Sequence, residues 1–203
     1  MAEQVISAPR SLPVGPVESH GVGWNGMACL IASEAALFGY LLFSYYYLGA
    51  SNPRGWLMEP HPDLHLALPN TLLLLASSVA AWWGERGVRQ ESKGQALAGL
   101  ALALVMGTVF ATVQVYEWHA KTYAPGTSSY ASLYFITTGL HMAHVVIGLA
   151  VLAMLILWIA FGYFSPLRRL PVSNGVLYWH FVDAVWLFVF TTYYLTPLLG
   201  FAR

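Results

Sequence analysis

Histidine and carboxylate side chains occur in otherwise apolar stretches of this sequence. His141 and His144 lie in TTGLHMAHVVIG, and His180 and Asp183 lie in YWHFVDAVW. A spacing of three residues places both members of each pair on one face of a helix. Carboxylates and such histidine pairs from several helices are the ligands that metal centres in helical bundles use. Metal binding is therefore the first chemistry to consider.

Depth along the helices argues against a shared metal site. His180 and Asp183 lie near the start of their stretch, whereas His141 lies about 15 Å or more deeper, at 1.5 Å per helical residue. No Glu-x-x-His motif, as in the usual di-iron arrangement, is present. A haem would need two histidines at matched depth, but His141 and His180 match poorly, and His144 and His180 only somewhat better. The favoured interpretation is a structural network in which each ionisable group is paired or neutral.

Three more polar residues lie within or at the edge of apolar stretches. Glu34 is near the middle of the first, and Gln114 and Glu117 are near the end of the third. Polar groups are expensive in hydrocarbon and nearly always face the bundle interior, where they pair. Because Glu34 is expected at a depth similar to that of His180 and Asp183, the first stretch is the predicted partner of that pair.

The composition is that of a membrane protein. The chain has 203 residues, of which 58% are hydrophobic and 9% charged, whereas soluble domains have about 25% charged residues. The zero net charge gives no electrostatic case for nucleic-acid binding. The single cysteine, Cys29, forms no CxxC pattern and is interpreted as a packing residue.

Five apolar segments are long enough to cross a membrane, since a crossing helix needs about 20 residues. The predicted fold is an all-α integral membrane protein, a five-helix transmembrane bundle. Residues 1–23 form a polar tail without the pattern of a signal peptide, and residues 200–203 form a short C-terminal end. The predicted spans are about 24–50, 68–84, 94–117, 131–162 and 174–199.

The basic residues orient the predicted bundle. Six lie on the side of the N-terminus (Arg10, Arg86, Arg89, Lys93, Arg168 and Arg169), and three lie opposite (Arg54, Lys121 and Arg203). The positive-inside rule then places the N-terminus in the cytoplasm and the C-terminus in the periplasm. Four of the basic residues, Arg86, Arg89, Arg168 and Arg169, are candidates to bind anionic lipid head groups.

Small and aromatic residues predict how the helices pack. Small residues recur at every fourth position of the third span, which favours close helix packing. Aromatic residues gather at the span ends, as expected for rings at the two membrane–water interfaces. The small residues are Gly99, Ala103, Gly107 and Ala111, and the aromatic residues are Tyr45, Tyr46, Tyr47, Trp56, Trp82, Trp83, Trp118, Tyr193 and Tyr194.

Taken together, these segments resemble subunit III of the haem-copper terminal oxidases. YWHFVDAVWLFVFTTYYL is similar to the last helix of that family, and TTGLHMAHVVIG is similar to the penultimate helix. IASEAALF, LPNTLLLLASS and FATVQVYEW resemble its Ser-Glu motif, its Asn-Thr helix and its Gln-x-x-Glu motif. Their order and spacing agree with the family over residues 24–199. The matching motif residues are Ser33, Glu34, Asn70, Thr71, Gln114 and Glu117.

The sequence departs from the family pattern in two ways. It has no counterpart to the first two helices of the seven-helix form, so it resembles the short bacterial form. Family members often carry His and Glu shortly before the final Trp-His-Phe run, whereas this loop reads SPLRRLPVSNGVL. A role of those two residues in lipid or partner contact is therefore not carried over.

The resemblance implies an accessory subunit of a proton-pumping cytochrome c oxidase in the bacterial inner membrane. This chain would carry no haem, copper or catalytic residue, because the haems and copper would lie in subunits I and II. It would pack against subunit I, help proton uptake and hold phospholipids, with subunit II and further small or supercomplex subunits as other partners. Eight residues would form the interhelical polar network: Glu34, Asn70, Gln114, Glu117, His141, His144, His180 and Asp183.

Other functions stay open. A quinol oxidase has the same kind of subunit, although the Ser33–Glu34 pair favours the cytochrome c branch. A relative associated with nitric oxide reductase is a further alternative. From other classes, a stand-alone membrane haem enzyme and a small transporter remain, although a transporter would usually have its site at broken helices near the midplane.

Overall fold

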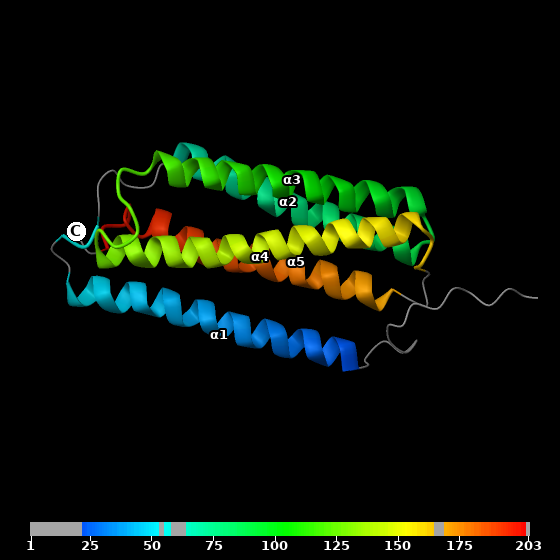
Figure 1. The fold of residues 1–203 in the computed structure, drawn as a ribbon, viewed down its shortest axis with the longest axis horizontal. Helices are drawn as coiled ribbons and strands as arrows, with labels where there is room; N and C mark the ends of the chain where they lie inside the picture. The colour runs from blue at the N-terminus through cyan, green and yellow to red at the C-terminus, as the bar shows by residue number, and fades with distance from the viewer. Residues whose placement is uncertain (1–21, 53–54, 58–63, 165–168, 202–203) are drawn as a thin grey trace, which may run out of the picture.

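A computed structural model describes residues 22–52, 55–57, 64–164 and 169–201, and it is all-helical over these residues (Figure 1). Five helices are long and apolar enough to cross a membrane, which confirms the predicted fold class. The fifth continues directly into a short π-helix, η2. The elements are α1 (Val22–Ser51), α2 (Leu64–Arg89), α3 (Lys93–Ala120), α4 (Ser129–Ala160), α5 (Leu170–Phe190) and η2 (Thr191–Leu195).

The helices lie side by side along the long axis of the molecule (Figure 1). Helix α2 packs on α3 and α5, and α4 packs on α3 and α5, so these four helices form the body of the bundle. Helix α1 packs on α4 and α5, away from the α2–α3 hairpin. Arg86, Arg89, Lys93 and Arg169 all lie at one end of the bundle, which we call the basic end.

Glycines allow α2 and α3 to approach closely. A Cβ atom added at Gly99 would lie 2.5 Å from the Cα of Gly84, and one added at Gly84 would lie 2.9 Å from the backbone nitrogen of Leu100. A side chain at either position would therefore push the two backbones apart. Only residues 90–92 connect the helices, with Glu91 in the left-handed region at φ 59°. The result is a compact antiparallel hairpin.

Local sequence signals explain where two of the helices begin. Ser128 precedes α4, and its hydroxyl accepts a hydrogen bond from the Ala131 backbone N–H at 3.1 Å, which satisfies one of the free donors of the first turn. Pro171 lies in the first turn of α5, where a missing N–H costs nothing. The predicted span 68–84 lies inside α2. Because α2 begins at Leu64, Pro69 lies within the helix and not at its first residue.

Part of the predicted interfacial aromatic belt lies inside the protein instead. Tyr45 and Tyr193 are fully buried, and their ring centroids are 4.9 Å apart. Trp56 and Tyr194 are also buried, so the interfacial assignment is wrong for these four. Rings from α1, α4 and η2 close this end of the bundle by packing against one another. In contrast, Tyr46, Tyr47, Trp82 and Trp83 are exposed.

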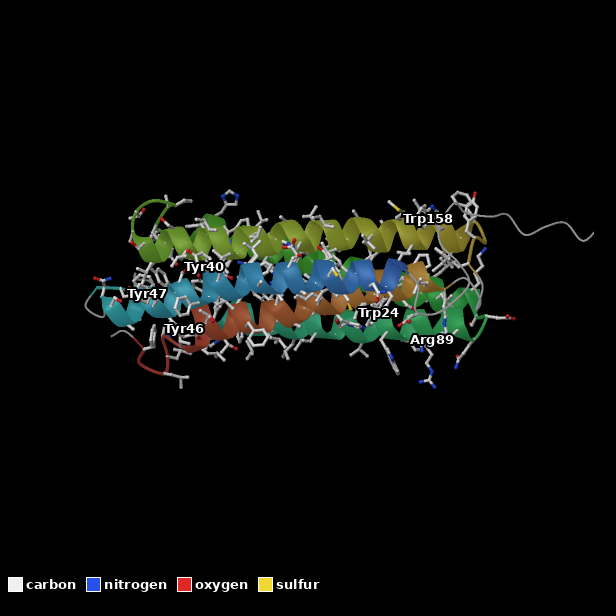
Figure 2. All side chains as sticks on the ribbon, turned by 90° about the horizontal axis from the view of Figure 1, so that it is seen from below. Trp24, Tyr40, Tyr46, Tyr47, Arg89 and Trp158 are labelled. Atoms are coloured by element: carbon white, nitrogen blue, oxygen red, sulfur yellow. The ribbon has the colours of Figure 1, made fainter. Side chains whose placement is uncertain are left out.

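Several aromatic residues lie toward the ends of the helices (Figure 2). Trp24 and Trp158 lie at the basic end together with Arg89, whereas Tyr46 and Tyr47 lie at the opposite end. Rings at these two levels suit the two interfaces of a membrane.

Candidate functional site

Ser78 of α2 joins both polar residues of the last helix. Its hydroxyl oxygen lies 2.9 Å from Nδ1 of His180 and donates a hydrogen bond to Oδ2 of Asp183. The prediction that the first span provides the partner of this pair is therefore wrong. Glu34 is instead bound elsewhere, and the residue that was missed is a serine in an apolar stretch.

The Ser78 contact belongs to a longer polar seam between α2 and α5. Thr71, Ser78 and Glu85 are spaced by seven residues, which returns each to the same helix face after two turns. Thr71 accepts from the indole N–H of Trp186 at 3.0 Å, and Glu85 accepts from the hydroxyl of Ser173 at 2.7 Å. We call this row of contacts the α2–α5 seam.

Glu34 joins α1 to α4 through His144. The carboxyl oxygen Oε2 lies 3.0 Å from Nε2 of His144, and Nδ1 of the same ring donates to the Leu140 carbonyl at 2.7 Å. Because a carbonyl only accepts, Nδ1 carries a proton, and one further proton must lie between Nε2 and the carboxyl group. The pair is partly exposed, with 25% of the Glu34 side chain accessible.

His141 has a different environment, although it lies three residues from His144. Its ring is fully buried and stacks on Trp186, with ring centroids 5.0 Å apart. Phe110 contacts it edge-on. Within the described part of the chain, neither ring nitrogen has a hydrogen-bond partner. The structure therefore does not join the two histidines in one polar cluster.

Glu117 is the centre of a buried ionic cluster at the end opposite the basic end. It accepts from Nζ of Lys121 at 2.9 Å and from the Tyr194 hydroxyl at 2.8 and 2.9 Å, so both carboxylate oxygens have partners. The Glu117 and Lys121 side chains are 6% and 7% exposed. Burial, reinforced by the negative charge of Glu117, raises the pKa of Tyr123 to about 12. Gln114, one turn before Glu117, is also buried.

Asn70 ties α2 to α3. Its side-chain amide donates to the Phe110 carbonyl at 3.3 Å, and the residue is 5% exposed. Of the eight predicted network residues, six have interhelical or buried ionic contacts: Glu34, Asn70, Glu117, His144, His180 and Asp183. They lie in separate groups rather than in one network.

The basic end contains a cavity beside the end of α2. It has a volume of about 330 Å³ and is lined by Trp82, Glu85, Arg86, Arg89 and Gln90. Arg86 lies over the ring of Trp82 at 5.5 Å, and Arg89 pairs with Glu85 at 2.6 Å. Arg169 is exposed just before α5, and Arg168 lies outside the described residues.

The polar groups bind one another across helices. Among residues 22–52, 55–57, 64–164 and 169–201, no group of three or more His, Cys, Asp or Glu side chains is arranged to hold a metal ion. The fold and these contacts define a multi-pass helical membrane protein whose ionisable side chains join its helices.

Comparison with known proteins identifies the family. Residues 17–197 match the family model for cytochrome c oxidase subunit III. Relatives named cytochrome c oxidase subunit 3 come from Gallus gallus (31% identity, covering 83% of this chain and 67% of the relative), Locusta migratoria (31%, 87% and 69%) and Drosophila melanogaster (32%, 86% and 69%). The chain belongs to the cytochrome c oxidase subunit III family, so it is a subunit III of a haem-copper oxidase, an enzyme complex of the respiratory chain.

Proposed function

We propose that this chain is an accessory subunit without a redox centre of its own, which packs against the catalytic subunit I. The observation that supports this role is the use of its ionisable side chains. Glu34, Glu117 and Asp183 all bind side chains of other helices or of the following loop, and these contacts stabilise the bundle. Haem and copper chemistry would then take place in subunits I and II.

We further propose that cytochrome c is the electron donor of the complex and that the chain lies in a bacterial inner membrane. The Ser33–Glu34 pair favours the cytochrome c branch over the quinol branch. The concentration of arginine and lysine at the basic end supports a cytoplasmic location for that end. The N-terminus would then be cytoplasmic and the C-terminus periplasmic.

The cavity at the basic end is the proposed site for a phospholipid head group. Arg86 and Arg89 offer positive charge, and Trp82 offers a ring at the level of the interface. Such sites attract anionic lipids through charge and through the amphipathic ring. Arg169 would extend the positive surface at the start of α5, and the proposal for Arg168, outside the described residues, rests on the sequence alone.

Purification from native membranes in mild detergent tests the subunit assignment. We expect the chain to co-migrate with a haem-copper subunit I and to contribute no haem absorption of its own. Oxidation of reduced cytochrome c, but not of quinol, by this complex would support the proposed donor. A coloured, isolated 22 kDa chain would instead support a stand-alone haem enzyme.

Lipid analysis of charge variants tests the head-group site. We expect Arg86→Gln with Arg89→Gln to lower the anionic phospholipid that co-purifies. Lys93→Gln is the matched control, because Lys93 lies at the same end but binds the Ala160 carbonyl at 2.7 Å, away from this cavity. Equal lipid loss in both variants would show that the basic residues at this end only set the orientation of the helices and that the cavity is not a specific lipid site.

A further inference from the structure

Three exchangeable groups form one continuous hydrogen-bonded chain in the α2–α5 seam. Ser78 donates its hydroxyl proton to Oδ2 of Asp183, and its oxygen lies 2.9 Å from Nδ1 of His180. A hydroxyl group donates one hydrogen bond and accepts others. Since its proton points to Asp183, Ser78 accepts from an Nδ1–H of His180. The chain therefore runs in one direction, from the imidazole to the carboxyl group.

The two ends of this chain differ in accessibility. Asp183 is 3% exposed, and its second oxygen, Oδ1, has no hydrogen-bond partner among the described residues. His180 is only half-buried. Glu117 shows what a purely structural carboxylate has in this bundle, since both of its oxygens are hydrogen-bonded. Within the described residues Asp183 instead has only the Ser78 hydroxyl as a partner, so less stabilises its negative charge and Oδ2 can accept a proton.

Glu85 connects this chain to the basic end. It lies seven residues from Ser78 along α2, a rise of about 10 Å. It lines the 330 Å³ cavity and accepts a hydrogen bond from Ser173 of α5 at 2.7 Å. A carboxylate therefore joins the cavity to α5 two helical turns before His180.

We propose that His180, Ser78 and Asp183 form a proton relay from the basic end into the bundle. A proton leaves Nδ1 of the His180 imidazolium for Oγ of Ser78, while the hydroxyl proton of Ser78 moves to Oδ2 of Asp183. The imidazole becomes neutral, the carboxylate becomes a carboxylic acid, and the serine keeps one proton. No electron is transferred and no other reactant is needed. This relay goes beyond the proposed accessory role, because it gives the chain a proton-transfer step of its own.

Other ionisable groups on the helices packed against α5 define the field around the relay. Helix α2 contributes Glu85 and Arg89, which pair with each other. Helices α1 and α4 contribute Glu34 and His144, which also pair with each other. His141 of α4 lies against Trp186. A test of the relay must leave these five groups in place, so the Ser78 hydroxyl group is the one to remove.

Ser78→Ala removes the hydroxyl group but keeps His180 and Asp183, whereas Ser78→Thr keeps a hydroxyl. Ser77→Ala is the matched control, because the neighbouring Ser77 accepts from the Trp179 indole at 3.0 Å and donates to the Leu74 carbonyl, and neither of these partners belongs to the relay. Isotope-edited infrared spectroscopy of the intact oxidase after a pH step would follow the carboxyl band of Asp183, assigned by its loss in Asp183→Asn. We expect Ser78→Ala to slow its protonation by about a hundredfold. Ser78→Thr and Ser77→Ala should react at the original rate.

Two results would overturn the relay. One is a Ser78→Ala oxidase in which Asp183 gains its proton at the original rate. The other needs no variant: an Asp183 band in the unaltered oxidase that never shows the protonated form. Co-purification with haem-copper subunits and the haem spectrum are recorded on the same samples. A chain that relays protons but purifies without those subunits would contradict the accessory role and leave the relay standing.

Discussion

Helix α1 and the body of the bundle are held by different kinds of contact. In the most apolar 18-residue window of α1, 11% of the residues are buried, compared with 61% in that of the fifth span. The body contains the close backbone approach of α2 and α3 and the buried Glu117–Lys121 pair. Helix α1 is instead held by polar contacts at three positions along its length.

The contacts of α1 are spread along its length. Asn174 of α5 donates to the Gly23 carbonyl at 3.1 Å near the basic end, and the Glu34–His144 pair lies in the middle. At the other end, the Tyr45 hydroxyl lies 3.0 Å from that of Thr196. Each of these polar contacts is partly exposed or near a helix end. Substitutions in the body should therefore lower the free energy of unfolding more than substitutions in α1.

The largest effect is expected for Glu117→Ala in the body. This change leaves Lys121 buried without its partner, which typically costs about 3–5 kcal/mol. The free energy of unfolding in detergent would measure it. The double variant Glu117→Leu with Lys121→Met should recover most of the loss, since it removes both charges. A double variant as unstable as the single one would show that the cost does not come from the unpaired lysine.

Gly99→Ala should have the next largest effect. The added methyl group would lie 2.5 Å from the backbone of Gly84, and overpacking of this kind costs about 1–3 kcal/mol. Gly39→Ala in α1 is the matched control, because an added Cβ there meets nothing within 4 Å. Thermal unfolding of both variants would compare the two regions directly. An equal loss in both would contradict the difference between them.

A smaller effect is expected for Glu34→Gln in α1. Hydrogen bonds between membrane helices contribute about 0.6 kcal/mol on average, and this pair is partly exposed. The free energies of unfolding of this variant and of Glu117→Ala, measured under identical conditions, would show whether α1 contributes less to stability than the body. If Glu34→Gln were as damaging as Glu117→Ala, α1 would have to be counted as part of the body.

At neutral pH Tyr123→Phe should have the smallest effect, because its electrostatic consequence is visible only in alkali. The pKa of this tyrosine is about 12 in the folded protein and 10 ordinarily. Between these values the unfolded chain loses the proton first, so the tyrosine contributes a loss of stability as the pH rises from 10 to 12. Unfolding followed against pH should show a shallower decline in the phenylalanine variant and no difference below pH 10. Identical alkaline declines would mean that Tyr123 is not protected by burial.

The sequence predicted the class of fold because hydropathy fixes which segments cross a membrane. It also singled out Glu34, Glu117, His144 and Asp183, since charged groups in such segments need partners. It could not pair them, because pairing depends on how each helix is rotated about its axis. The Glu34–His144 contact, for example, follows from the placement of α1 against α4.

A second limit of the sequence concerns small neutral residues, because nothing in the sequence indicates their partners. Ser78 resembles the packing residues around it, and no charge indicates that it would bind both His180 and Asp183. The segment before the Trp-His-Phe run, which departs from the family pattern, is a second example. That segment lacks the family's Glu, yet Glu85 reaches Ser173 there from α2. A seven-residue spacing of hydroxyl and carboxyl groups along one apolar helix was the signal available.

The α2–α3 hairpin also has a consequence for biogenesis. Its contacts join residues close in sequence, from Gly84 to Gly99 across a three-residue connection, so little loop-closure entropy opposes their formation. We expect this pair to associate while it is still being inserted, and to provide the template on which α4 and α5 then dock. Helix α1, although synthesised earlier, has to wait for α4 and α5, so the order of assembly differs from the order of translation.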